Sequence, residues 1–195
     1  MKQAERRAKT REQILDAAEQ LFADHGVDGA TIDDIAEAAD LARGTFYYNF
    51  KTKDDVVMAL AKRDLRKQAV RSLKKLDDDG SSIETLRELL AGACRWYKKN
   101  RHLAETVLTY PFRNPESMAD SSEDESSFRY ITLEIIERGQ QRGELRDDID
   151  ARSLSQILIG VFLQATFFWV HHPQAGKLDE WIDQFLTVYL DGAKK

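Results

Sequence analysis

An all-α fold made of two helical domains is predicted from three observations. Apolar residues recur at intervals of three and four along most of the 195-residue chain, which is the spacing of one helix face. Proline is scarce, with 3 residues, so few segments are barred from helical conformation. Several apolar segments follow a Ser, Thr or Asp that can cap a helix N-terminus. The turn-like residues 77–80, DDDG, mark the boundary between the domains.

The N-terminal segment combines a basic arm with a first helix. Residues 1–9, MKQAERRAK, are expected to form a flexible arm. Thr10 with Gln13 resembles a capping box, and Gly26 is expected to end the helix. The apolar face of this helix comprises Ile14, Ala18, Leu21 and Phe22.

Two short helices separated by a tight turn follow. Thr31 with Asp34 forms a capping box, and Asp40 interrupts the apolar pattern. A second short helix then begins near Ala42. This arrangement is the helix-turn-helix unit, whose second helix can enter the major groove of DNA. The first of the two helices has its apolar face at Ile32, Ile35, Ala36 and Ala39.

The second short helix has polar residues where base edges would lie. Phe46 and Phe50 are four apart and are expected to anchor the helix to its own small core. Thr52 with Asp55 then forms a capping box for the next helix. The predicted DNA-contacting residues are Thr31, Arg43, Gly44, Thr45, Tyr47, Tyr48, Lys51 and Lys53, with Tyr48 and Lys53 as phosphate contacts and Arg43 and Thr45 as base contacts.

The stretch TIDDIAEAADLARGTFYYNFKTKDDVV resembles the N-terminal DNA-binding domain of TetR-family transcriptional regulators, and the likeness extends over roughly residues 10–60. Two positions depart from the family pattern. Asp40 stands where Gly is usual, and Asp tolerates a left-handed turn position. Ala42 stands where Ser or Thr is frequent, so a capping hydroxyl worth about 1 kcal/mol is missing.

The resemblance implies a three-helix DNA-binding domain over residues 1–53, with helix four, about 53–75, linking it to the rest. The basic arm then has two readings, as a contact with the DNA minor groove or as an ordinary frayed terminus.

An effector-binding and dimerisation domain is expected over residues 81–195. Its predicted helices cover 81–100, 102–110, 128–141, 151–171 and a last segment that contains Trp181. Pro111 is expected to end the second of these helices. Residues 114–127 are acidic and Ser-rich, and are read as a solvated connector, with a regulatory role as the alternative.

The last two helices carry more apolar residues than one monomer needs. The resemblance implies that they form a four-helix interface in a homodimer, which would also place two reading helices on neighbouring half-sites. The alternative is that the stripe packs within one chain. The predicted interface residues are Leu158, Phe162, Ala165, Trp169, Trp181, Phe185 and Val188.

The resemblance also implies a cavity for a small-molecule effector, with an apolar or aromatic compound favoured. The predicted function is a repressor that the effector releases from operator DNA, although some relatives activate transcription. Candidate pocket residues are Trp96, Tyr97, Tyr110, Phe128, Phe162 and Phe167.

Charge and cysteine content agree with this interpretation. The net charge is −5, but residues 1–75 hold 15 Lys and Arg against 13 Asp and Glu, a balance of +2 that leaves −7 for the remainder. The single Cys94 suits a reducing cytoplasm. No signal sequence or membrane span is expected, because the most apolar run, 157–170, is shorter than the ~20 residues that a span needs.

Two other classes of protein are alternatives to a DNA-binding regulator. An enzyme is disfavoured because no catalytic triad, phosphate loop or zinc spacing is present, and neither a metal nor a cofactor is expected. Cys94 with His102, and the pair His171 and His172, lack further ligands. A helical protein-interaction module is the other alternative, and its binding would respond weakly to salt.

Overall fold

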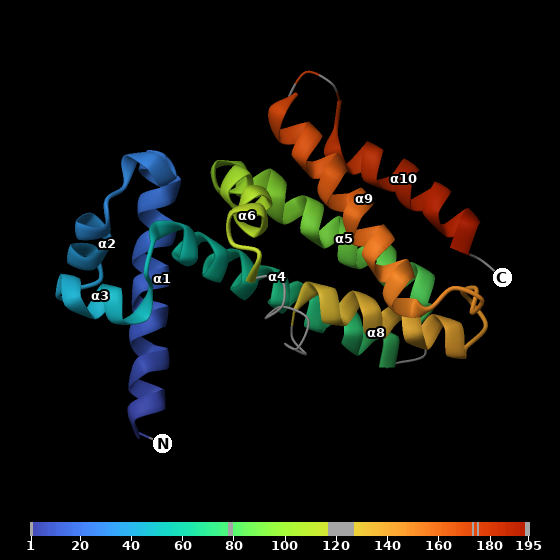
Figure 1. Cartoon of the computed structure of the whole chain (residues 1–195), viewed down its shortest axis with the longest axis horizontal. Coiled ribbons are helices and arrows are strands. Elements are labelled where there is room, and N and C mark those ends of the chain that lie inside the picture. Colours follow the sequence, from blue (N-terminus) through green and yellow to red (C-terminus); the bar gives the residue numbers. More distant parts are fainter. Residues whose placement is uncertain (1, 78–79, 117–126, 173, 175, 194–195) are drawn as a thin grey trace. The chain divides into compact units, whose positions relative to one another are not determined.

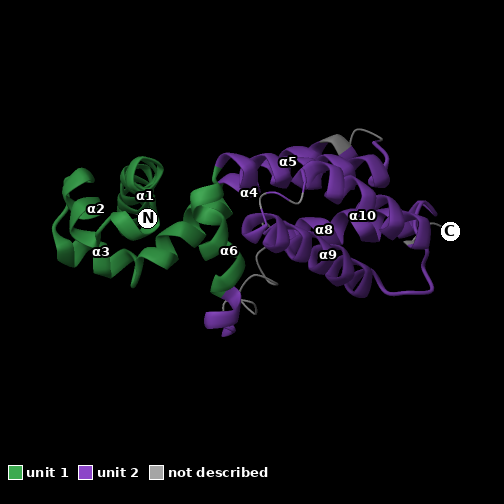
Figure 2. Cartoon of the chain, turned by 90° about the horizontal axis from the view of Figure 1, so that it is seen from above, with its two compact units in different colours: residues 1–63, 100–110 green, residues 64–99, 111–195 purple. Residues whose placement is uncertain are grey.

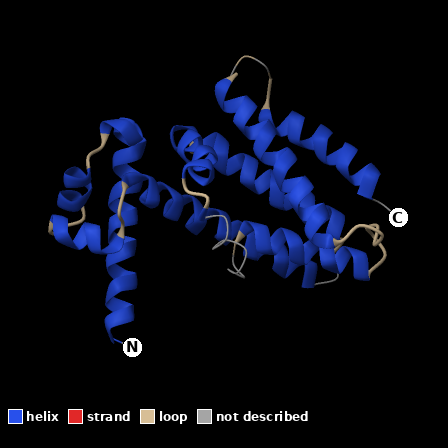
Figure 3. Ribbon diagram, in the orientation of Figure 1, coloured by secondary structure: helices blue, strands red, loops and turns tan. Residues whose placement is uncertain are grey.

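The structure is a computed structural model that describes residues 2–77, 80–116, 127–172, 174 and 176–193. Every regular element within these ranges is an α-helix (Figure 3), so the all-α prediction is confirmed. The helices are α1 (Lys2–Gly29), α2 (Ile32–Ala38), α3 (Arg43–Asn49), α4 (Lys53–Asp77), α5 (Ser82–Lys99), α6 (Arg101–Arg113), α8 (Phe128–Gln141), α9 (Ala151–His171) and α10 (Leu178–Ala193).

The chain divides into two compact units, shown in different colours in Figure 2. Unit 1 comprises residues 1–63 and 100–110, and unit 2 comprises residues 64–99 and 111–195. The division therefore falls within α4, and most of α6 belongs to the unit that contains α1, α2 and α3. The sequence had suggested one boundary at residues 77–80 and had placed α6 in the C-terminal domain.

In unit 1, α1 packs against both α2 and α3. Buried Ile14, Ala18 and Phe22 supply the inner face of α1. The helix is kinked at Gly26, whose φ of 72° and ψ of 170° are non-helical, close to its expected end. The expectation of a flexible arm is wrong for residues 2–9, because these residues continue α1 as helix (Figure 1). Thr10 accordingly lies inside α1 and does not cap it.

The start of α2 and the turn between α2 and α3 both have the predicted geometry. Thr31 Oγ1 accepts from the Asp34 amide at 3.1 Å, and Asp34 Oδ2 accepts from the Thr31 amide at 2.8 Å, which completes the capping box. Asp40 adopts a φ of 55°, the left-handed conformation that Asp tolerates. Ala42 is the N-cap of α3 and makes no side-chain cap bond.

The start of α4 is held by a second reciprocal cap. Asp55 Oδ2 accepts from the Thr52 amide at 2.9 Å, and the Thr52 hydroxyl accepts from the Asp55 amide at 3.1 Å. The other carboxylate oxygen accepts from the hydroxyl of Tyr110 on α6 at 2.6 Å. Burial raises the pKa of Asp55, but the hydrogen bonds from Tyr110 and Thr52 outweigh it, so the pKa lies below its usual value.

In unit 2, α5 packs against α8, α9 and α10. The α8 and α9 helices begin at the caps Ser127 and Asp150, whose side chains accept from the amides of Tyr130 and Ser153. Pro111 does not end α6 as predicted, because the helix continues through it to Arg113. Residues 117–126 of the expected connector lie outside the described residues.

By length and composition alone, the α9 helix is long and apolar enough to cross a membrane. Of its most apolar 18-residue stretch, 44% is buried inside the fold. Core helices of soluble proteins pass the same test. Its packing against α5, α8 and α10 is that of a core helix.

Candidate nucleic-acid interface and effector site

The α3 helix has one buried and one exposed side. Phe46 is fully buried, Phe50 directly after the helix is 4% exposed, and the two rings lie 6.2 Å apart. Tyr47 and Tyr48 are 45% and 66% exposed on the outer side. The anchoring role predicted for the two phenylalanines is therefore confirmed.

Arg43 lies at the first turn of α3 and is held on both sides. Its Nη1 donates to Asp33 Oδ2 of α2 at 3.0 Å, and its Nη2 donates to the Tyr47 hydroxyl oxygen at 3.4 Å. The bond with Tyr47 and then the charge of Asp33 raise the pKa of Arg43. Because Tyr47 accepts this bond, its own O–H proton stays available to another acceptor.

Gly44 and Thr45 lie between these residues on α3. A Cβ atom added at Gly44 would meet nothing within 4 Å, so no packing within the described chain requires glycine there. Thr45 is partly exposed, and its backbone carbonyl accepts from the Asn49 side chain at 2.8 Å. The first turn of α3 therefore offers an open surface to an approaching ligand.

Three further predicted DNA contacts, Thr31, Lys51 and Lys53, have different environments. Thr31 and Lys51 are exposed beside α2 and α3. Lys53 instead directs its ammonium group to the backbone oxygens of Val27 and Ala30, both at 2.7 Å. These bonds connect the start of α4 to the end of α1 and to the residue after it, so we treat Lys53 as a structural residue.

Sequence reasoning missed two arginines of α1 that lie against the end of α3. Arg11 Nη1 donates to the backbone oxygen of Asn49 at 2.7 Å, and its guanidinium lies 4.1 Å from the centre of the Phe50 ring. Arg7, one turn earlier, lies 5.4 Å from the centre of the Tyr48 ring. The i, i+4 spacing of these arginines was a usable signal, but it requires the N-terminal segment to be helical.

Unit 2 contains a cluster of four aromatic residues from α5, α8 and α9, which we call the aromatic cluster. Trp96 and Tyr97 lie edge to face at 5.1 Å, and Phe162 lies 6.0 Å from Tyr97 and 6.1 Å from Phe128. Trp96 Nε1 donates to Asp64 at 3.2 Å. Tyr97 is 3% exposed, and its hydroxyl has no hydrogen-bond partner among the described residues. Burial alone raises the pKa of Tyr97.

Two other candidate pocket residues lie elsewhere. Tyr110 belongs to unit 1, where its hydroxyl is bound to Asp55. Phe167 is 39% exposed on α9 and stacks on His171 at 4.2 Å. Neither residue belongs to the aromatic cluster, because each lies outside the inner face of unit 2.

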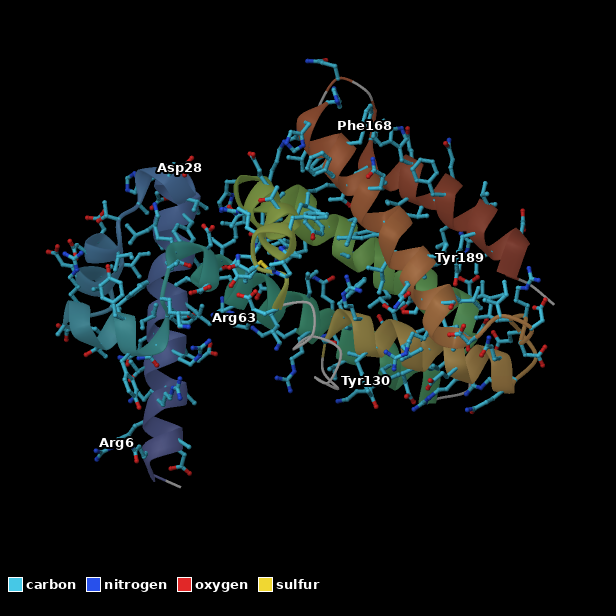
Figure 4. The ribbon with its side chains drawn as sticks, in the orientation of Figure 1. Arg6, Asp28, Arg63, Tyr130, Phe168 and Tyr189 are labelled. Atoms are coloured by element: carbon cyan, nitrogen blue, oxygen red, sulfur yellow. The ribbon has the colours of Figure 1, made fainter. Side chains whose placement is uncertain are left out.

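The predicted dimer interface divides between two faces of the last helices. Leu158, Phe162, Ala165 and Trp169 are at most 8% exposed within a single chain, so they lie in its core and offer little surface to a second copy. Trp181 is partly exposed, and its ring lies 5.5 Å from that of Phe168. The exposed apolar face (Figure 4 labels Phe168) comprises Ile157 at 51%, Phe168 at 44%, Phe185 at 42% and Val188 at 74%.

Among the described residues, no group of three or more His, Cys, Asp or Glu side chains is placed so that it could hold a metal ion. Burial raises the pKa of the Cys94 thiol to about 12, which keeps it protonated and unreactive.

Two family models match the chain. The model described as bacterial regulatory proteins of the TetR family matches residues 14–60, and the model described as a tetracyclin repressor-like C-terminal domain matches residues 76–185. The first covers the helix-turn-helix, and the second covers most of unit 2.

Two curated proteins are similar over most of their length. The HTH-type transcriptional repressor AcnR of Corynebacterium diphtheriae is 30% identical over 142 residues, which are 71% of this chain and 70% of that protein. The fatty acid metabolism regulator protein of Bacillus subtilis is 25% identical over 181 residues, 92% of this chain and 93% of that protein.

Solved structures share the fold. FadR from Thermus thermophilus, a TetR-family repressor in complex with lauroyl-CoA, aligns with a TM-score of 0.80 at 23% identity and covers 93% of this chain and 94% of that one. FadR from Bacillus subtilis in complex with stearoyl-CoA aligns with a TM-score of 0.72 at 24% identity, over 93% and 98% of the two chains.

The C-terminal family model alone spans more than half of the chain, and the N-terminal model coincides with the exposed helix-turn-helix. This chain belongs to the TetR family of bacterial regulatory proteins.

Proposed function

We propose that the protein binds operator DNA as a homodimer, with α3 of each protomer reading one half-site, and that a long-chain acyl thioester releases it. The observation that supports the DNA-binding role is the exposed side of α3. Arg43 and Tyr47 are exposed there and hydrogen-bonded to each other, whereas Phe46 on the opposite side is buried. A short helix of this kind reads base edges through its N-terminal residues.

Arg43 and Thr45 are the proposed base-reading residues. An arginine side chain recognises guanine by donating two bonds to O6 and N7. Asp33 and Tyr47 fix the Arg43 guanidinium before DNA arrives, so less conformational entropy is lost on binding. The open space beside Gly44 would let the duplex backbone or a base edge approach the helix closely.

Thr31, Tyr48 and Lys51 are the proposed phosphate contacts. All three are exposed. The Thr31 hydroxyl oxygen accepts the capping bond of α2, which leaves its proton for a phosphate oxygen. Contacts of this kind set the position of the protein on the duplex and carry no sequence information.

Homodimerisation is proposed through the exposed apolar face of α9 and α10. Phe185 and Val188 are 42% and 74% exposed on α10, although they lie on a helix whose other face is buried at Ile182 and Leu186. Ile157 and Phe168 extend the same property to α9. A second copy of the same surface would remove these side chains from water and pair two reading helices.

The aromatic cluster is the proposed effector site. Buried aromatic rings favour an apolar chain, and the unpartnered Tyr97 hydroxyl can donate to a carbonyl oxygen. A fatty acyl thioester contains both features. The similarity to two proteins solved with lauroyl-CoA and stearoyl-CoA supports this class of ligand. The effector must prefer the arrangement that does not bind DNA, since equal affinity would shift nothing. The cytoplasm, where DNA and acyl thioesters meet, is the proposed location.

Selection of DNA from a random pool by the purified protein tests the proposed DNA-binding role. We expect an enriched two-fold symmetric sequence with half-sites about one helical turn apart. The Arg43→Ala variant is expected to lose roughly 10- to 100-fold of its discrimination at one base pair of each half-site. An unchanged preference in Arg43→Ala would remove the base-reading role, and a pool without enrichment would remove the function.

Salt dependence distinguishes DNA binding from binding of a protein partner. Operator affinity should fall linearly with the logarithm of salt concentration, since phosphate contacts release counterions. Lauroyl-CoA added to the operator complex should dissociate it, whereas coenzyme A without the acyl chain should not. Release by neither compound would contradict the proposed effector class and leave DNA binding intact.

A further inference from the structure

We propose that the first turns of α1 form an additional contact with the DNA backbone, through Arg6 and Arg7, outside the helix-turn-helix. This inference rests on the proposed DNA-binding role of α3. It assigns the basic N-terminal residues to the backbone phosphates of the same duplex that α3 reads.

The helical state of residues 2–9 gives these charges fixed positions. The α1 helix starts at Lys2, and its first turns run on past α2 and α3 within unit 1 (Figure 1). Residues 3–9 are all exposed. Arg6 projects from the helix close to its free end (Figure 4). A rigid helix holds cations in place at a lower entropic cost than a flexible arm does.

The pairing of Arg7 with Tyr48 joins this helix to the recognition surface. Arg11 and Arg7 lie four residues apart and both lie over aromatic rings of the α3 region, at 4.1 and 5.4 Å. Arg11 is also bound to the Asn49 backbone and therefore has a structural role. Arg7 lies instead over the ring of Tyr48, which is 66% exposed and is a proposed phosphate contact.

Neither Arg6 nor Arg7 is paired with a carboxylate among the described residues. Three acidic residues in the middle of α1, Glu12, Asp16 and Glu19, bind Arg63 of α4, and Glu5 is the one acidic residue in the first turn. Four of the six residues from 6 to 11 are basic and none is acidic. The start of α1 therefore presents a net positive charge beside α3, since residues 2–11 hold five basic residues and one acidic residue.

The occupant that fits this surface is double-stranded DNA. A basic surface continuous with a reading helix lies where the duplex backbone passes, and guanidinium groups bind phosphate oxygens through two parallel bonds. Such a contact strengthens binding to every sequence alike, since phosphates are the same along the duplex.

The test is the full-length Arg6→Gln/Arg7→Gln variant, titrated with the selected operator and with a scrambled duplex over a range of salt concentrations. Both affinities should fall by the same factor, about tenfold at 0.15 M salt. The slope of log affinity against log salt should become shallower by about two to four, since about 0.9 is lost for each phosphate contact in each protomer. The selected sequence should not change.

The matched control is Arg66→Gln/Arg152→Gln, which removes the same two charges at exposed positions outside the proposed surface. It should leave both the affinity and the slope close to those of the unmodified protein. A thermal melt should show both variants folded, as expected for exposed substitutions.

Equal behaviour of the two double variants would overturn the proposal while operator selection by the unmodified protein stood. A changed sequence preference in Arg6→Gln/Arg7→Gln would overturn it as well, because the contact would then read bases. Failure of the unmodified protein to select any sequence would instead remove the DNA-binding role on which this inference depends.

Discussion

Unit 1 keeps its functional side chains outside, whereas unit 2 encloses its aromatic cluster and leaves a separate apolar face exposed. In α3, buried Phe46 fixes the helix, and Arg43, Tyr47 and Tyr48 are exposed. In α9, Phe162 faces the core while Phe168 is 44% exposed, and both are phenylalanine. Residue type thus reveals the role of a side chain in α3 but not in α9.

The difference follows from what each helix must contact. A short helix with one anchor pair has a single possible inner face, so its outer face can be assigned from spacing alone. A long helix that is apolar on two sides can bury either side, and only its packing decides which one. Variants in unit 2 therefore test which face of a helix is buried, whereas variants in unit 1 test what each exposed side chain binds.

The largest effect is expected from charging the exposed apolar face. The Phe185→Glu/Val188→Glu variant should be monomeric, because two carboxylates cannot be buried unpaired in an apolar interface. A monomer presents only one α3 helix to the operator, so operator binding should weaken by ~10³-fold or more. Sedimentation and operator titration measure both effects. Leu158→Ala is the contrast, since its fully packed side chain should cost about 2–5 kcal/mol of stability without changing the oligomeric state.

Lys53 and Lys51 separate structural from DNA-contacting lysines in unit 1. Lys53→Gln should lower the free energy of unfolding by about 1–3 kcal/mol, because the Val27 and Ala30 oxygens lose a charged donor. Lys51→Gln should leave stability unchanged and make the salt dependence of DNA binding shallower. Urea unfolding and DNA titration distinguish them, and the reverse pattern would exchange the two assignments.

Tyr97→Phe tests the interior of unit 2. Removal of an unpartnered hydroxyl should leave the unfolding midpoint unchanged or slightly raised. Lauroyl-CoA should bind about tenfold more weakly, because its carbonyl loses a donor. Calorimetry measures the affinity. Full affinity in this variant would place the ligand carbonyl elsewhere.

Gly44→Ala should separate stability from binding in α3. Alanine favours helix over glycine by up to about 1 kcal/mol, and the added Cβ meets nothing in the chain, so the melting temperature should rise. Operator affinity should fall several-fold if the duplex occupies that open space. A variant that is both more stable and fully active would show that Gly44 does not face DNA.

The smallest effect concerns Tyr110 and pH. The pKa of Asp55 is depressed in the folded state, so its ionised form stabilises the protein above its unfolded pKa of about 3.9, and this contribution is lost as pH falls through the lower folded value. In Tyr110→Phe a donor is missing, so the variant should have a lower urea midpoint at pH 7. That gap should narrow below about pH 4, and a constant gap would assign the effect to packing.

The helix-turn-helix was predictable from the sequence because its signals are local. Thr31 with Asp34, the break at Asp40 and the pair Phe46 and Phe50 each lie within a few residues of their partners. The structural role of Lys53 was not predictable, since the carbonyls that it binds lie more than twenty residues away in the sequence.

The same limit applies to the interface of unit 2. Leu158 and Val188 are equally apolar in sequence, yet one is 1% and the other 74% exposed. Helical spacing restricts which residues share a face, but the choice between two apolar faces depends on the neighbouring helices. Tyr110 illustrates the point differently, because its partner Asp55 was recognised only as a cap.

Arg63 makes the tolerance of α1 and α4 to mutation unequal. Its side chain is 15% exposed and binds three acidic residues of α1, whose side chains are each at least 45% exposed. Loss of Glu12, Asp16 or Glu19 singly leaves two acceptors in place, so the three acids are redundant. Loss of Arg63 leaves three like charges close together without the cation that they share. Random mutagenesis should therefore recover functional replacements at the acidic positions and very few at position 63.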